Sequence, residues 1–407
     1  MSRLLGDEKS FWSVLAWTSG ALAFGKGLTT PNRWSATQAQ VNYHFGFVKR
    51  GLFGQLFAGP LGLQHYRRFV AFSGFILILL VLSLVLYTAK SRLQERFGSY
   101  QFAALFFSSY SFTFIVNLIG YLDLVLCILA VVVLLIEDAK LRLVAAISVS
   151  IVALMVHEVF FVIFLPLLML SFFLQLGRPS PTASPAAEST PRRLSMLTAV
   201  LLLGTVATLT TVWISARPSL RADQVAAMQK EIASNTNFEV RPDFFEVMTR
   251  SVSDNAATTQ LFYKQPSWWL ANVISLLVFG PTLLLLVLAT KYICRSDANF
   301  PKGSLLLATL AVFSPLAMHL VAWDAARWNA WVVVVSYLVL LTFCRFAKNA
   351  RPELSPLWKN AIFLVIVLNI ASGNLLMDSR KESLFPFFKE RLELKKLKPS
   401  WVGPPAL

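Results

Sequence analysis

Charge is scarce in this chain, and acidic charge is the scarcer kind. Asp, Glu, Lys and Arg make up 14% of the 407 residues, well below the roughly 25% of a typical soluble domain. There are 37 Lys and Arg against 21 Asp and Glu, so the formal net charge is +16. Hydrophobic residues make up 56% of the chain, and the mean hydropathy is +0.62. This composition excludes an ordinary soluble domain.

Cysteine and histidine are also rare, at three and four residues. Cys127 falls inside an apolar run, and Cys294 and Cys344 fall at the ends of two others. This spacing provides no disulfide framework and no metal-binding pair. We therefore expect neither a metal site nor a cofactor.

Long apolar runs recur along the whole chain, without the two-residue alternation of β-barrel strands. A run of about 20 apolar residues crosses a hydrocarbon core about 30 Å thick. The sequence therefore predicts an all-α polytopic membrane protein, with residues 1–407 forming a single integral membrane domain. About eleven transmembrane helices are expected, near residues 11–28, 69–88, 101–119, 121–136, 141–156, 157–176, 195–215, 269–290, 303–322, 329–346 and 357–377.

The N-terminal run loosely resembles a signal peptide. Asp7 and Glu8 interrupt the basic segment that such a peptide needs, so we expect an uncleaved first span. Two other apolar runs are too long for one crossing. Residues 141–176 would make a helix about 54 Å long, so we expect a hairpin with His157 and Glu158 at its turn. The run 101–136 should turn within "NLIGYLD", residues 117–123.

Lys and Arg in short loops set the orientation, because such loops remain on the cytoplasmic side. Alternation places five basic loops together: 90–96, 137–142, 178–193, 291–302 and 345–359. We expect a multi-pass protein of the bacterial inner (cytoplasmic) membrane with a cytoplasmic N-terminus. Residues 177–194, rich in Pro, Ser and Ala, predict a cytoplasmic disordered linker. Residues 216–266 predict a large outer loop with short amphipathic helices.

Two basic segments contradict this rule. The basic and aromatic loop 26–68 and the basic amphipathic tail 378–407 both fall on the outer side. A span count wrong by one at either end would move the corresponding segment inside. Otherwise, the loop holds its cations outside for a purpose.

The unusual polar residues share the predicted outer face. Ionisable groups near spans are costly and are commonly functional when retained. The candidates for catalysis are Glu158, Asp123, His157 and Asp324. The candidates for substrate binding are Tyr43, His44, Lys49, Arg50, Gly51, Arg327, Trp328 and His319.

Each of these motifs also has a structural interpretation. "HFGFVKRGLFG" fits an interfacial loop whose cations meet lipid phosphate. Asp123 fits an acidic residue at a helix N-terminus. His157 and Glu158 fit a hydrogen-bonded turn, and Asp324 and Arg327 fit a helical ion pair. The tryptophans fit an aromatic belt at the membrane interface.

The functional interpretation is a transferase that acts on lipid-linked substrates. Lys49 and Arg50 would hold a donor phosphate or pyrophosphate, with glycines allowing close approach of the backbone. A carboxylate or histidine would accept the proton of an acceptor hydroxyl. Aromatic side chains would position a sugar.

The segments "FGFVKRGLFG", "GYLD", "HE" and "DAARW" resemble bacterial polytopic proteins of surface-polysaccharide synthesis. The layout is similar to O-antigen or exopolysaccharide polymerases and to polyprenyl-linked glycosyltransferases of the GT-C superfamily. This resemblance implies a helical bundle, a polyprenyl-linked sugar donor, a glycan acceptor and contact with other polysaccharide-assembly proteins.

One departure from the GT-C pattern matters. Those enzymes carry an acidic residue in the first outer loop, whereas residues 27–68 contain no Asp or Glu. The acid would have to come from Asp123, Glu158 or Asp324, and the first loop would bind phosphate. The departure favours a polymerase over a standard GT-C enzyme.

Two other functions compete. A lipid-linked glycan flippase or transporter would place ionisable residues near mid-span, often in repeats, and neither feature is evident. A membrane acyltransferase would use His157 or His319, but no acyl-carrier or nucleotide motif is present. Nucleic acid is not an expected partner, whereas membrane lipid is.

Overall fold

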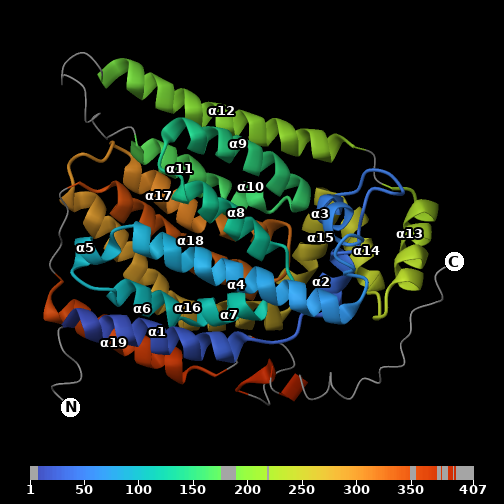
Figure 1. Cartoon of the computed structure of the whole chain (residues 1–407), viewed down its shortest axis with the longest axis horizontal. Coiled ribbons are helices and arrows are strands. Elements are labelled where there is room, and N and C mark those ends of the chain that lie inside the picture. Colours follow the sequence, from blue (N-terminus) through green and yellow to red (C-terminus); the bar gives the residue numbers. More distant parts are fainter. Residues whose placement is uncertain are drawn as a thin grey trace.

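The computed structural model describes residues 8–175, 189–217, 220–348, 354–373, 377, 384–387 and 389–390. Every regular element within these ranges is a helix, and no strand occurs among them. The predicted all-α class is therefore confirmed. Figure 1 shows long helices running side by side, with shorter helices gathered at one end of the bundle.

Among the described residues, five helices are long and apolar enough to cross a membrane. An α-helix pairs its backbone N–H and C=O groups within itself, which the hydrocarbon core requires. This supports a multi-pass membrane protein. The five are α4 (Tyr66–Lys90), α9 (Ala139–Val156), α12 (Ser189–Ala216), α16 (Pro266–Ser296) and α18 (Ala325–Phe346).

The other six predicted spans correspond to α1 (Glu8–Gly27) and to shorter or broken helices. The chain turns between helices at 118–122 and 157–159, where turns were expected, and at the loop 136–138. The shorter elements are α6 (Gln101–Phe107), α7 (Tyr110–Asn117), α8 (Asp123–Leu135), α10 (Phe160–Ile163), α11 (Leu165–Gln175), α17 (Ser304–Phe313), η1 (Ser314–Leu320) and α19 (Pro356–Ala371).

Three segments expected as continuous spans are broken. The Ser109 side chain accepts a hydrogen bond from the Phe112 backbone N–H at 3.1 Å, so a new helix begins after α6. Phe164 separates α10 from α11. α17 tightens into the 3-10 helix η1, with Pro315 in its first turn. The mean hydropathy of these segments did not reveal the breaks, although Ser108-Ser109 and Ser314-Pro315 mark two of them in the sequence.

Helix α18 forms the centre of the bundle. In its most apolar stretch 94% of residues are buried, against 22–39% in the other four long helices. The Tyr337 ring stacks on Phe106 with centroids 4.0 Å apart, and its hydroxyl lies 2.8 Å from the Thr88 hydroxyl. Tyr87 and Thr342 make a second buried hydroxyl pair at 2.8 Å. These bonds fix α18 against α4 and α6.

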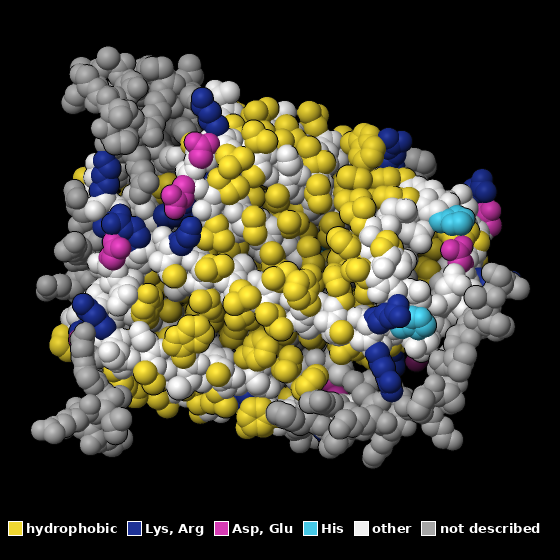
Figure 2. Space-filling model, in the orientation of Figure 1, with side chains coloured by type: hydrophobic (Ala, Val, Ile, Leu, Met, Phe, Trp, Pro, Cys, Tyr) yellow, Lys and Arg dark blue, Asp and Glu magenta, His cyan; other side chains and the backbone are white. Residues whose placement is uncertain are grey.

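The outer surface of the bundle is apolar where a lipid-facing surface would be. Leu276 and Leu277 of α16 are 69% and 70% exposed, and α4 exposes Ile78, Leu82 and Leu86. In Figure 2 a broad apolar belt separates two ends that carry the charged side chains. Large exposed apolar surfaces of this kind mark contact with a membrane or a partner.

Hydrogen bonds hold the basic loops together at one end of the bundle. From α5 (Leu93–Phe97), Arg96 donates to the carbonyl oxygens of Cys344 at 3.2 Å and Lys348 at 2.8 Å. Arg345 donates to the Ile136 carbonyl, and the Lys348 N–H donates to the Asp297 carboxylate. The described parts of four predicted cytoplasmic loops therefore share one end, on the left in Figure 1.

The first loop and the segment 216–266 meet at the opposite end. The first loop contains α2 (Arg33–Gln38) and α3 (Gly51–Phe57), and residues 216–266 contain three short helices, as predicted. Val41 and Val48 of the loop form a small second core with residues of these helices. The three helices are α13 (Ala222–Asn235), α14 (Pro242–Thr249) and α15 (Val252–Tyr263).

The predictions for the linker 177–194 and for the C-terminal tail have different outcomes. The linker prediction for 177–194 is wrong at 189–194, because α12 begins at Ser189. Pro191 lies in its first turn, where a missing N–H has no partner to lose. The remainder of that linker lies outside the described residues, as does most of the tail 378–407. Within the described part of the tail, the Glu390 carboxylate accepts hydrogen bonds from Thr29 and Thr30 at the end of the bundle that holds α2 and α3.

Gly27→Ala should destabilise the bundle. A Cβ at Gly27 would lie 2.2 Å from the Thr113 carbonyl oxygen, so α1 would have to move away from α7. Overpacking of this kind costs about 1–3 kcal/mol. A thermal unfolding curve of the purified protein should show a lower Tm. Gly74→Ala in α4 is the matched control, because a Cβ there meets nothing within 4 Å. An equal effect at both glycines would contradict the packing of α1 on α7.

Cysteines placed beyond the two ends of α16 should label from opposite sides of the membrane. Ser253 and Ser296 are both exposed, before and at the end of this helix. Replacing Cys294 with Ala gives a suitable background, since Cys127 and Cys344 are 0% exposed. In intact cells an impermeant maleimide should label Ser253→Cys at once and Ser296→Cys only after permeabilisation. Labelling of both from the same side would exclude α16 as a single crossing.

Candidate functional site

The first loop obtains an acid from a distant part of the chain. Arg50 precedes α3 in a left-handed backbone conformation, with φ of 66°. Its Nε donates to Glu158 at 3.0 and 3.2 Å, and its Nη2 donates to the same carboxylate. Bidentate geometry makes this a strong, directional pair. The loop that contains no Asp or Glu is thus joined to Glu158, one of the three acids expected to serve it.

His157 lies behind this pair. α9 ends at His157, whose extended backbone (φ −164°) turns the chain back into the bundle. The imidazole is 3% exposed, and its Nδ1 lies 3.3 Å from the Glu158 carboxylate. A neutral imidazole with a bare Nδ1 can accept the Val159 N–H at 3.4 Å, whereas a protonated one can donate to Glu158. Glu158 itself keeps 40% of its side chain exposed.

Asp123 and Arg327 form a second, deeper ion pair. Asp123 is the first residue of α8 and is 0% exposed. Arg327 Nε and Nη2 each donate to one of its carboxylate oxygens at 2.7 Å, and Trp331 Nε1 donates at 3.2 Å. The Asp324 carboxylate lies farther from Arg327, at 3.9 Å. The helical ion pair expected between Asp324 and Arg327 is therefore secondary, because the main partner of Arg327 is Asp123.

Aromatic rings connect this second pair to the first loop. The Arg327 guanidinium lies 4.6 Å from the centre of the Tyr121 ring and 4.7 Å from that of Trp328. Asn32, the N-cap of α2, donates to the Tyr121 hydroxyl at 2.9 Å. Trp328 is 3% exposed and Trp331 is 0% exposed. These two tryptophans are therefore core residues and do not form an aromatic belt at the surface.

The two pairs are neighbours in space. The charges of Arg50 and Asp123 both act on His157, so both pairs lie within electrostatic range of this imidazole. The structure thus brings together Arg50, His157, Glu158, Asp123 and Arg327. Asp324 lies at the edge of this group, with 44% of its side chain exposed.

His319 belongs to a separate polar cluster between η1, α16 and α18. Its Nε2 lies 3.1 Å from Asn329 Oδ1, and Asn329 in turn donates to Asn272 at 3.1 Å. The Trp268 ring meets the imidazole edge-on at 5.7 Å. The sequence analysis missed Trp268, Asn272 and Asn329. Two asparagines and a Trp-Trp pair within otherwise apolar segments were the features of the sequence that could have indicated this cluster.

The aromatic residues of the first loop pack on one another. Tyr43 stacks on Phe47 at 5.5 Å, and burial raises the pKa of the Tyr43 hydroxyl above its usual value. A Cβ at Gly51 would lie 2.7 Å from the Tyr43 ring, so this glycine makes room for tyrosine. His44 is exposed and stacks on Phe45 at 5.0 Å.

Lys49 differs from Arg50 in having no compensating acid. It is half-buried, and it makes no hydrogen bond or ion pair with any residue that the structure describes. Because Arg50 is committed to Glu158, Lys49 is the cation of this pair that an anionic group can approach. A charge-assisted contact to phosphate is the chemistry that a free ammonium offers.

Across the described ranges, no three His, Cys, Asp or Glu side chains gather in a way that could hold a metal ion. The three cysteines are free. Comparison with models of known protein families, with curated proteins and with solved structures finds no match to this chain. The site must therefore be interpreted from its own chemistry.

Asp123→Asn should destabilise the protein strongly, because it leaves the Arg327 charge buried without its main partner. Breaking a buried pair in this way costs about 3–5 kcal/mol. The midpoint of thermal unfolding should fall accordingly. Glu95→Gln is the control, since its pair with Arg92 is exposed on both sides and such pairs contribute little. A normal midpoint for Asp123→Asn would show that the pair carries no stability.

Proposed function

We propose that the chain is a membrane glycosyltransferase or polysaccharide polymerase that uses sugars linked to polyprenyl (pyro)phosphate. The observation that carries this proposal is the arrangement of Lys49, Arg50 and Glu158. It combines a cation available to an anion with an accessible carboxylate held in one orientation. Transfer of a sugar from a phosphate leaving group requires these two functions together.

In this proposal Glu158 is the general base. Its carboxylate accepts the proton of the acceptor hydroxyl as that oxygen attacks the anomeric carbon. The bond from this carbon to the donor's phosphate oxygen breaks, and the polyprenyl (pyro)phosphate leaves with the electron pair. Lys49 lies next to Arg50 and stabilises the negative charge of this leaving group. The exposed 40% of Glu158 gives the acceptor access.

Arg50 and His157 are positioning residues in this proposal. The bidentate bond of Arg50 keeps the Glu158 carboxylate ionised and aimed, and buried His157 can take up or return a proton beside it. Asp123 and Arg327 hold the floor of the site. Asp123 is 0% exposed, so an acceptor hydroxyl cannot reach its carboxylate, whereas Glu158 is accessible.

The proposed setting is the outer face of a bacterial inner membrane, where lipid-linked sugars are assembled into surface polysaccharide. The site lies at the end of the bundle opposite the basic loops, which supports an outer location under the positive-inside rule. The His319 cluster and the exposed His44 lie at this same end of the chain's helices, where an extended glycan could contact them.

Glu158→Gln should lower kcat by about 10²–10⁴-fold, the usual contribution of a general base. Lys49→Ala should lower kcat/KM for the donor by about ten- to a hundredfold, because one charged hydrogen bond to its phosphate is lost. The assay is transfer of radiolabelled sugar from polyprenyl diphosphate donors by the purified protein in lipid nanodiscs. The donors should be a panel of common hexoses and N-acetylhexosamines.

Lys230→Ala provides the matched control for Lys49→Ala. Lys230 is an exposed lysine on α13, at the same end of the protein, outside the proposed site. It should leave both constants unchanged. Full activity of Glu158→Gln, with the protein folded as judged by its Tm, would reject Glu158 as the base. Absence of transfer from every donor would reject the glycosyltransferase proposal itself.

A further inference from the structure

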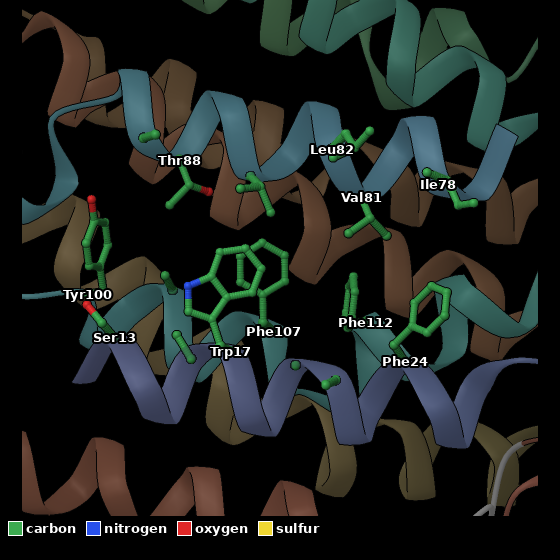
Figure 3. A pocket seen from close by; sticks show the side chains of 16 residues that line it. Ser13, Trp17, Phe24, Ile78, Val81, Leu82, Thr88, Tyr100, Phe107 and Phe112 are labelled. Atoms are coloured by element: carbon green, nitrogen blue, oxygen red, sulfur yellow. The ribbon is translucent and has the colours of Figure 1, made fainter. Parts of the chain in front are cut away.

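A groove runs along the apolar surface between α1 and α4. α1 packs on α6 and α7, and a cavity of about 470 Å³ opens between α1 and α4 above α6. Figure 3 shows Trp17 and Phe24 of α1 facing Val81 of α4 across this space, with Phe107 of α6 between them. Cavities of about 300–1,000 Å³ are typical of ligand sites.

Small residues create the space. Ala16, Gly20 and Ala21 of α1 and Ala103 of α6 line it, where longer side chains would fill it. A Cβ at Gly20 would lie 3.1 Å from the Phe107 Cβ, so this glycine lets α6 approach closely and form the floor. Trp17 is 67% exposed and forms a wall on the open side. The groove is thus a permanent feature of the packing of α1 on α6.

The two ends of the groove differ in chemistry. Ser13 and Tyr100 place hydroxyl groups at one end, and Phe24, Ile78 and Phe112 close the other, as Figure 3 shows from left to right. The hydroxyl end faces the basic loops, which follow α4 and precede α6. Lys9 is exposed one turn before Ser13 on the same face of α1. A lysine and the hydroxyl groups of Ser13 and Tyr100 therefore lie near one mouth of an apolar groove.

The length of the groove matches one leaflet of a bilayer. From Ser13 to Phe24 the helix rises about 16 Å at 1.5 Å per residue. Half of a hydrocarbon core about 30 Å thick is about 15 Å. A single extended acyl chain of that leaflet would fill the groove, with its head group level with Lys9 and Ser13.

We propose that this groove is a binding site for one acyl chain of an anionic phospholipid whose head group lies at the basic end of the protein. Apolar lining, a cationic mouth and the length of one leaflet together define such a ligand. The site is separate from Glu158 and Lys49, which lie at the other end of the bundle. The proposal therefore does not depend on the proposed transferase activity.

Photo-crosslinking tests the site directly. The full-length protein in phosphatidylcholine nanodiscs is exposed to phosphatidylglycerol carrying a diazirine near the end of one acyl chain, and adducts are located by peptide mass spectrometry. We expect adducts concentrated at the closed end, on peptides containing Phe24, Ile78 and Phe112. The phosphatidylcholine analogue should give much weaker labelling of the same peptides.

Two neighbouring residues of α4 give a matched pair of variants. Val85 lines the groove, whereas Leu86 is 53% exposed on the adjoining surface. Val85→Trp should reduce the groove adducts by about tenfold or more, because the indole displaces several methylene groups of the chain. Leu86→Trp should leave them unchanged. Lys9→Gln should reduce the preference for phosphatidylglycerol over phosphatidylcholine.

Several results would overturn the proposal. Adducts spread evenly over the lipid-facing helices of the unaltered protein would show ordinary boundary lipid, whether or not Val85→Trp folds. Equal labelling by phosphatidylglycerol and phosphatidylcholine would show that the groove does not select an anionic head group. Loss of the phosphatidylglycerol adducts on adding equimolar polyprenyl phosphate would assign the groove to a polyprenyl chain instead.

Discussion

The buried bond between Asp123 and Arg327 is the contact on which the polar end of the bundle depends. It joins the start of α8 to the central helix α18, with neither charge near bulk water. Removing two charges from water is costly, and only a complete set of hydrogen bonds offsets that cost. Here Trp331 provides a third donor, and the rings of Tyr121 and Trp328 cover the guanidinium. Because Tyr121 accepts from Asn32, the same pair also fixes the first loop.

The second ion pair has a different character. Arg50 and Glu158 are only partly buried, and the bond leaves the carboxylate open on one side. The deep pair therefore holds the helices in place, while the shallow pair holds an accessible carboxylate in a fixed orientation. His157 contacts Glu158 of the shallow pair and lies within electrostatic range of Asp123 in the deep one. The proposed transfer chemistry rests on this oriented carboxylate and on Lys49, which has no acid partner among the residues that the structure describes.

Much of this arrangement could be predicted, because apolar runs and their interruptions are local features. The positions of α4, α9, α16 and α18, and the turn at His157, followed from hydropathy and helix length. Asp123, Glu158 and Arg327 were conspicuous as charges within apolar sequence. Their partners were not predictable. Arg50 is 108 residues from Glu158, and Asp123 is 204 residues from Arg327, so spacing along the chain carried no information about either contact.

The sequence by itself determined that the chain is helical and apolar, and that its basic loops should gather at one end. These properties depend on side-chain hydrophobicity and charge, which each segment carries wherever it packs. Packing brings Glu158 to Arg50, whereas Lys49 has no acid partner in the described part of the chain. The tertiary structure also broke three apolar segments by caps and tight turns, and it left a groove where small residues of α1 face α6. Such features depend on distances between residues remote in the chain, and only packing sets those distances.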